Sequence, residues 1–136
     1  MREINRIIIH CSATPENRIV TVADITQWHK ARGFNTIGYH WVIGLNGELW
    51  QGRIEEVAGA HCEGYNANSI GVCYVGGMSK DMKSAKDTRT PKQKETLLKL
   101  LIQLKKTYPR AKIYGHRDFS NKDCPSFDAK SEYKNI

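Results

Sequence analysis

Apolar residues first gather in short runs, a pattern that is typical of β-strands. Ile7-Ile8-Ile9 lies between polar residues within 4–11, as expected for a strand that is buried on both faces. Further strands are predicted at residues 39–43, 48–51, 69–75 and 111–115. Asn46-Gly47 separates the first two of these and is a strong hairpin signal, so we expect them to pair directly.

The spacing of apolar residues becomes helical after residue 20. Thr21, with Asp24 three positions later, predicts a helix that begins with a capping box, and Gly33 is its expected end. The face predicted to be buried consists of Val22, Ile25 and either Trp28 or His29. This segment is therefore expected to form the first helix.

The clearest helix of the sequence follows residue 90. Thr90 and Gln93 form a second capping box, Pro91 suits the first turn, and Pro109 ends the pattern. The predicted apolar stripe consists of Leu97, Leu98, Leu101, Leu104 and Tyr108. A short final helix is predicted after Ser126.

Residues 78–89 are polar and rich in lysine, which predicts an exposed loop, and the charges between Lys80 and Lys94 are expected to form a solvated face. Strands mixed with two substantial helices and a hairpin predict an α/β fold, a mixed β-sheet flanked by helices. A length of 136 residues fits a single domain, predicted to span 1–136.

Charge narrows the classes of partner. The 21 Lys and Arg residues outnumber the 14 Asp and Glu residues, which gives a net charge of +7 with neutral histidine. This excess favours an anionic partner, and nucleic acid, an acidic membrane surface and the bacterial cell wall all qualify. Residues 1–6 carry charges where an export signal needs an apolar run of about 7–15 residues. No stretch approaches the roughly 18 apolar residues of a membrane span, so we expect a protein made and kept in the cytoplasm.

Candidate metal ligands are spread along the chain. His116 and Cys124 are eight residues apart in a loop-forming segment, which lets the loop fold back onto one ion. His10 ends the first predicted strand and His116 ends the last, so the two imidazoles meet if these strands are neighbours. A catalytic zinc site needs three such ligands and a fourth position for water. On spacing alone, His10 also fits a strand-end histidine bonded to backbone, and Cys124 fits a small buried apolar residue.

A longer pattern carries a family resemblance. The matching segments are residues 9–14, 27–29, 38–40, 46–47, 52–53, 64–72, 116–118 and 122–128. They cover nearly the whole chain in one order, and they resemble the zinc-dependent N-acetylmuramoyl-L-alanine amidases. Within that family, the similarity is greatest to amidase-type bacteriophage lysozymes, and peptidoglycan recognition proteins share the fold.

The resemblance implies a set of roles. His10, His116 and Cys124 match the family's ligands for Zn²⁺, which leaves one position for water. Tyr39 and Lys122 match its catalytic residues, and His61 matches a histidine that lines the substrate cleft. Outside this set, His29 is expected to be structural, and His40 should face away from Tyr39 because neighbouring strand residues alternate. With no secretory signal, free or metal-bound thiols are expected rather than disulfides, and Cys11, Cys62 and Cys73 have no assigned role.

The implied activity is hydrolysis of the amide between N-acetylmuramic acid and L-alanine in bacterial peptidoglycan. A Lys122 ammonium would stabilise the oxyanion of the transition state, and Tyr39 would either orient water or assist proton transfer. No motif places a Glu as general base. We expect a monomer that acts on the cell wall after release, without nucleic acid or membrane as partner. Two alternatives stay open: a peptidoglycan-binding module without activity, in whose relatives the ligand cysteine is typically replaced, and a phage lysozyme that also inhibits a phage RNA polymerase.

Overall fold

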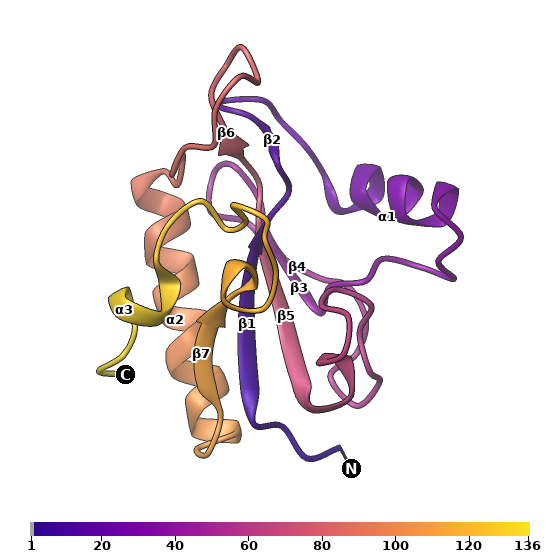
Figure 1. The fold of residues 1–136 in the computed structure, drawn as a ribbon, viewed down its shortest axis with the longest axis vertical. Coiled ribbons are helices and arrows are strands. Elements are labelled where there is room, and N and C mark those ends of the chain that lie inside the picture. Colours follow the sequence, from indigo (N-terminus) through magenta and orange to yellow (C-terminus); the bar gives the residue numbers. More distant parts are fainter. Residues whose placement is uncertain (1) are drawn as a thin grey trace.

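The computed structural model describes residues 2–136, and a five-stranded mixed sheet lies at its centre (Figure 1). Its strands are β1 Arg6–Cys11, β3 Trp41–Ile43, β4 Leu49–Gln51, β5 Ser69–Tyr74 and β7 Lys112–Gly115. They lie in the order β4-β3-β5-β1-β7, with β1 parallel to both β5 and β7. β3 is parallel to β5 and antiparallel to β4, which confirms the predicted hairpin. The α/β class is confirmed, and each strand is one or two residues shorter than predicted.

Three α-helices accompany the sheet: α1 Val22–Ala31, α2 Pro91–Thr107 and α3 Ala129–Glu132. The capping boxes that begin α1 and α2 are both present as predicted, at Thr21 and Thr90. Two short 3-10 helices, η1 Asn66–Asn68 and η2 His116–Asp118, precede β5 and follow β7. No helix within residues 2–136 combines the length and the apolar character that crossing a membrane requires.

Alternation along β1 separates an apolar face of the sheet from a functional one. Ile7, Ile9 and Cys11 belong to the main core cluster, and the α2 residues in that cluster are Leu97, Leu100, Leu101 and Leu104. Because successive strand residues point to opposite faces, Ile8 and His10 face away from α2. On that second face, a smaller apolar cluster joins α1 to β3. Since α2 covers one face and α1 only part of the other, the end of β1 remains available for a site (Figure 1).

One predicted core position is wrong, and the structure decides between two residues that the sequence left open. Leu98 was expected in the buried stripe of α2, but its side chain is 42% exposed, while Leu100 is buried. A shift of one residue turns a side chain by about 100° around the helix, which carries Leu98 out of the stripe that begins at Leu97. On α1, His29 rather than Trp28 is buried beside Ile25.

The predicted exposed loop at 78–89 is exposed in its middle and wrong at both ends. At its start, β6 Gly77–Met78 pairs in parallel with β2 Thr14–Pro15 to form a separate two-stranded sheet. At its end, Thr88 and Arg89 are buried. The Thr88 hydroxyl accepts a hydrogen bond from the backbone N–H of Gly77. Arg89 is buried because it forms ion pairs with Asp87 and Glu132, which the local sequence pattern does not predict.

Candidate metal centre

Two histidines meet because the strands that carry them are neighbours. His10 lies near the end of β1, and His116 directly follows β7. Ile9 is opposite Gly115 in the parallel pairing, so the residues that follow them, His10 and His116, lie side by side. Their ring centroids are 4.6 Å apart. The condition for their meeting, that these two strands are neighbours, is therefore fulfilled.

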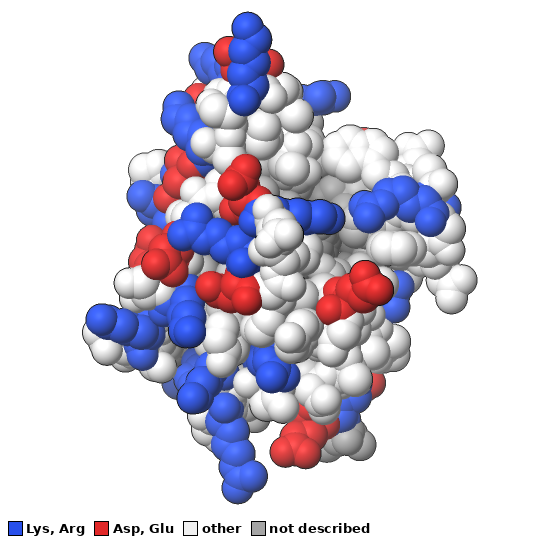
Figure 2. Space-filling model, in the orientation of Figure 1, with Lys and Arg blue, Asp and Glu red and all other residues white. Residues whose placement is uncertain are grey.

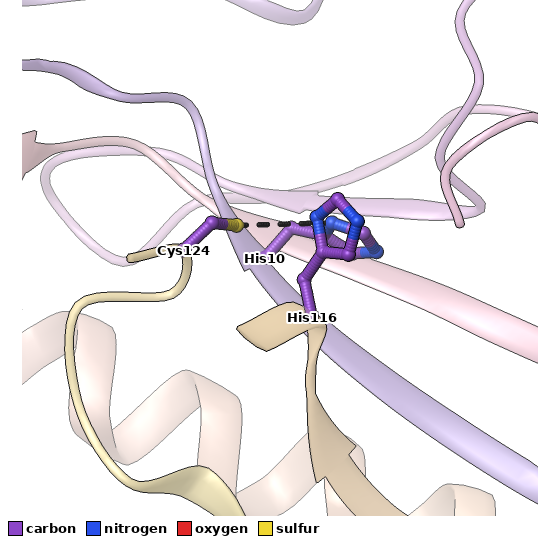
Figure 3. A group of neighbouring side chains, drawn as sticks. All are labelled: His10, His116 and Cys124. Carbon is purple, nitrogen blue, oxygen red and sulfur yellow. Dashed lines mark hydrogen bonds between the residues drawn. The ribbon is translucent and has the colours of Figure 1, made fainter. Parts of the chain in front are cut away.

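Cys124 completes the cluster from a loop that returns to the same end of the sheet. Its Sγ lies 3.8 Å from Nδ1 of His10, and Figure 3 shows this sulfur facing the two imidazoles. One ligand atom from each of His10, His116 and Cys124 lies within 4.8 Å of the others, the single such group among residues 2–136. Two imidazoles and a thiol are the donor types of a catalytic zinc site.

Hydrogen bonds hold Cys124 in place from several directions. The backbone N–H of Arg117 donates to the Cys124 carbonyl at 2.7 Å, which closes the loop after β7. The Tyr74 hydroxyl, from β5, donates to the Pro125 carbonyl at 2.6 Å. The backbone N–H of Cys11 donates to the Cys124 sulfur at 3.2 Å. The sulfur is therefore positioned by the sheet itself, even though it comes from a loop.

Both histidines of the cluster are held neutral. Burial lowers the pKa of His10 well below its usual value, and the charges of His61, His116 and Lys122 lower it further. Burial also lowers the pKa of His116, with a smaller contribution from Lys122. A neutral imidazole offers the lone pair that a metal ion needs, so both rings are in the ligand form at pH 7.

Among residues 2–136, no cationic side chain is bonded to the Cys124 thiol. A hydrogen bond with the Cys11 thiol and burial together raise the pKa of Cys124 far above that of an ordinary thiol. A divalent cation reverses this preference, because it deprotonates a coordinating thiol outright. No Asp or Glu belongs to the cluster. Two neutral imidazoles and one thiol therefore fit a soft or borderline divalent ion such as zinc better than Mg²⁺ or Ca²⁺.

The cluster lies in the wall of a cavity of about 750 Å³, a size within the usual range of ligand pockets. Two basic residues, Arg32 and Lys122, line this cavity, against one acidic residue, Glu63. The rings of Phe34 and Phe119 also line it. Figure 2 shows a hollow between α1 and the rest of the molecule, with basic side chains on both of its sides. The cavity therefore favours an anionic or amphipathic ligand.

The two residues predicted as catalytic, Tyr39 and Lys122, both line the cavity. The ring centroids of Tyr39 and His10 are 5.1 Å apart. Burial raises the pKa of Tyr39 well above its usual value, and the nearby thiols of Cys73 and Cys124 add to this, so the hydroxyl keeps its proton at pH 7. Lys122 forms no ion pair within the described chain, residues 2–136, which leaves its ammonium group available to a ligand.

His61 also lines the cavity, but protein groups occupy both of its ring nitrogens. Its Nδ1 lies 2.8 Å from Nε2 of His10, and its Nε2 lies 3.2 Å from the Ser69 hydroxyl. Burial is the main reason that the pKa of His61 falls to about 3. The substrate contact implied for His61 stays a prediction. Its link to His10 and Ser69 was not foreseen, because no local pattern relates these three positions.

The remaining histidines bond to backbone, which agrees with the structural role expected for His29. Nδ1 of His29 accepts the N–H of Gly38 at 2.8 Å, and Nδ1 of His40 accepts the N–H of Gly71 at 3.0 Å. The four cysteines form no disulfide. Sequence reasoning did not identify Arg32, Phe34 and Phe119 as cavity residues, because only the fold brings these separate loops together.

Comparisons with known proteins point in one direction. A family model described as N-acetylmuramoyl-L-alanine amidase matches residues 1–127. The endolysin of Enterobacteria phage K11 is 43% identical over 128 residues, which cover 93% of this chain and 83% of that protein. The amidase LysC from Clostridium intestinale URNW superposes with a TM-score of 0.82 at 28% identity, covering 96% of this chain and 82% of that one. A point mutant of Drosophila PGRP-LB, solved with tracheal cytotoxin, superposes with a TM-score of 0.81 at 26% identity, covering 99% and 82%.

Proposed function

The chain belongs to the N-acetylmuramoyl-L-alanine amidase family and degrades peptidoglycan, and we propose that His10, His116 and Cys124 hold the zinc ion this activity requires. The bond that is cleaved joins N-acetylmuramic acid to the L-alanine that begins the stem peptide. Its cleavage detaches the peptides from the glycan strands, which lyses the cell wall. The enzyme therefore acts on the wall, whichever route brings it there.

One observation carries the zinc assignment: three neutral or ionisable donors, without any carboxylate, converge within 4.8 Å in the wall of a cavity. Structural zinc sites use four protein ligands, whereas catalytic sites use three and leave a position for water or substrate. The cluster has three, so it fits the catalytic type. Its position in the cavity wall supports access by a substrate.

The proposed chemistry divides between the ion and the side chains. When bound, zinc supplies a Lewis acid that polarises the amide carbonyl and lowers the pKa of a water ligand to about 7. As water adds to the carbonyl carbon, the carbonyl oxygen gains negative charge. The Lys122 ammonium stabilises that charge. The protonated Tyr39 hydroxyl donates a hydrogen bond that orients the reacting groups beside His10. The C–N bond then breaks, and a proton from the added water passes to the alanine nitrogen, which leaves as the amine.

The cavity suits a muropeptide. Stem peptides carry free carboxylates, and the basic residue Arg32 lies in the lining to meet them. The aromatic rings of Phe34 and Phe119 offer apolar surface to the sugar and to peptide side chains. In this proposal the enzyme works as a monomer on peptidoglycan, with no nucleic acid or membrane as partner.

A product assay on metal-depleted and zinc-restored protein tests the proposal. Purified peptidoglycan is digested, and two products are counted: new N-terminal alanine and new reducing sugar ends. The expected result is new N-terminal alanine without reducing ends, lost after metal depletion and recovered with zinc. Full activity of the metal-depleted protein would refute the zinc assignment. Peptidoglycan binding without any cleavage, beside an active control enzyme, would instead favour a non-catalytic binding module.

A further inference from the structure

We propose that His61 and Ser69 are positioning residues, which hold His10 in the one tautomer that can bind a metal ion through Nδ1. The inference rests on the proposed zinc site, since it assigns an outer layer of residues to that site. Neither residue contacts the ion in this proposal. Each acts through His10, by fixing where the ring proton resides.

The direction of the hydrogen bonds follows from the position of the cluster. Nδ1 of His10 is the nitrogen that faces the Cys124 sulfur, at 3.8 Å, so this nitrogen must carry no proton when it is a ligand. The proton of His10 is then on Nε2, and it is donated to Nδ1 of His61 across 2.8 Å.

The same reasoning fixes His61. Since Nδ1 of His61 accepts, a neutral ring carries its proton on Nε2. Nε2 of His61 lies 3.2 Å from the Ser69 hydroxyl, and it donates a hydrogen bond to the oxygen of that hydroxyl. Ser69 is fully buried at the start of β5, and no other side chain is bonded to its hydroxyl among residues 2–136. The chain His10–His61–Ser69 therefore has one consistent assignment when a metal is bound.

The structure holds the His61 ring in a fitted slot. A Cβ atom placed on Gly59 or on Gly71 would lie 2.6 Å from Cδ2 of His61, so the slot exists only because these two residues are glycines. The backbone N–H groups of His61 and Cys62 both donate to Oδ1 of Asn66, at 2.9 Å each. The ring is therefore confined by Gly59 and Gly71, and its backbone is anchored by Asn66, as positioning requires.

The competing role for His61 is direct contact with the substrate. Both ring nitrogens already have protein partners, and the residue is only 9% exposed. A substrate group that bonded to either nitrogen would have to displace His10 or Ser69. These contacts favour the positioning role.

Metal affinity separates the two roles. Zinc binding is measured by competition with a chelator in wild-type protein, His61→Leu and His61→Asn. Leucine removes the acceptor, and we expect zinc to bind about 10–100-fold more weakly, the usual loss for an outer partner of a ligating histidine. Asparagine places its Oδ1 near the position of Nδ1 and accepts the same hydrogen bond. It should therefore restore most of the affinity.

Ser69→Ala tests the end of the chain with a smaller disturbance, the loss of one hydroxyl group. We expect a loss of zinc affinity that is smaller than that of His61→Leu. Nitrogen NMR of histidine-labelled, zinc-loaded wild-type protein reports the tautomers directly. The expected protons are on Nε2 of both His10 and His61.

The outcomes distinguish this inference from the zinc site itself. If wild-type protein binds no zinc, the proposed function fails. If wild-type protein and His61→Leu bind zinc equally while KM alone rises in the variant, His61 is a substrate contact and the inference is overturned. A proton on Nδ1 of His61 in the zinc-loaded protein would overturn it as well, whatever the stability of the variants.

Discussion

The segment 124–127 touches two buried polar clusters, and they satisfy their polar groups in opposite ways. On one side, the ring of Phe127 packs beneath the Arg89 guanidinium, 3.4 Å from its carbon to the ring centroid. Arg89 has a side chain only 1% exposed, and it pairs with Asp87 at 2.9 Å and Glu132 at 2.8 Å. Its charge is fully matched by the chain itself, so this cluster has nothing left to bind.

On the other side, Cys124 meets His10 and His116, and no Asp or Glu among residues 2–136 belongs to their cluster. Burying polar groups is costly unless partners satisfy them. Where the chain supplies every partner, as around Arg89, the cluster fastens the fold. Where three electron-pair donors converge with no carboxylate beside them, as at His10, His116 and Cys124, we propose that a cation from solution is their common partner. The contrast distinguishes a structural cluster from a binding site without reference to any relative.

The largest expected effect comes from Cys124→Ser. The variant should lose zinc and at least about a thousandfold in activity, since a Lewis acid contributes several kcal/mol and each 1.4 kcal/mol is about tenfold. Its secondary structure should remain, because the loop keeps its other hydrogen bonds. Metal content by mass spectrometry, muropeptide release and circular dichroism measure the three quantities.

Cys62→Ser is the matched control for this variant, since Cys62 lines the same cavity outside the cluster. It should keep both zinc and activity. Equal zinc content in Cys124→Ser and wild-type protein would remove the sulfur from the site.

Lys122→Ala should lower kcat by about 10²–10³-fold, the usual cost of removing one group that stabilises an oxyanion. Zinc content should stay unchanged, because Lys122 is not a ligand. Steady-state kinetics on soluble muropeptides measures kcat and KM separately. Lys80→Ala, at an exposed lysine outside the cavity, is the control and should behave as wild-type protein. An unchanged kcat with a raised KM would make Lys122 a binding residue only.

Arg89→Met should break the other cluster and spare the zinc site. The free energy of unfolding should fall by about 2–3 kcal/mol, less than the roughly 3–5 kcal/mol of a fully buried pair. The loss is reduced because the side chains of Asp87 and Glu132 stay 31% and 43% exposed and can be hydrated. Urea unfolding of the metal-free protein measures it. A large loss of zinc affinity at unchanged stability would show that the two clusters are not separate in function.

The smallest effect is the pH dependence of the Arg89 cluster. Hydrogen bonding to Arg89 lowers the pKa of Glu132. Burial by itself would raise the pKa of Asp87. The hydrogen bonds and the positive charge of Arg89 outweigh burial, so the pKa of Asp87 is lowered as well. Both carboxyl groups have a lower pKa in the folded protein than their ordinary values of 3.8 and 4.5. Their ionised forms therefore stabilise the fold at pH values above these ordinary pKa values. This contribution is lost as the pH falls through the lowered values.

Urea unfolding of metal-free protein at about pH 6 and about pH 3 measures this contribution. Arg89→Met should lose less stability between the two conditions than wild-type protein does, since its carboxylates no longer have a partner. An equal loss in both proteins would show that other groups cause the pH dependence. Removing the metal keeps zinc release out of the comparison.

Local chemistry predicted most of the fold. Residues close together in the sequence determine three predicted features, and all three are present. They are the capping boxes at Thr21 and Thr90 and the turn at Asn46-Gly47. Apart from the position of Leu98 around its helix, the errors fall where distant residues decide the outcome. Arg89 is buried by Glu132, 43 positions away, and the two-stranded sheet joins residues 14–15 to 77–78.

The site likewise contains some contacts that the sequence indicated and others that it did not. The sequence placed His10 and His116 at the ends of two predicted strands, but only the structure shows that these strands are neighbours and that the two rings are adjacent. The bond from His10 to His61 spans 51 positions, and no periodicity or motif encodes it. Ser69 gave one weak signal, a hydroxyl at the start of an otherwise apolar strand. Contacts between loops depend on the packing of the whole structure, so local sequence patterns do not predict them.

X-ray absorption at the zinc edge tests the central claim most directly, because it reports the atoms bonded to the ion. The account predicts one sulfur at about 2.3 Å and two imidazole nitrogens at about 2.0–2.1 Å, with a lighter fourth ligand. In Cys124→Ser the sulfur contribution should vanish together with tight binding. A zinc-loaded wild-type protein whose ion shows only nitrogen and oxygen neighbours would contradict the account.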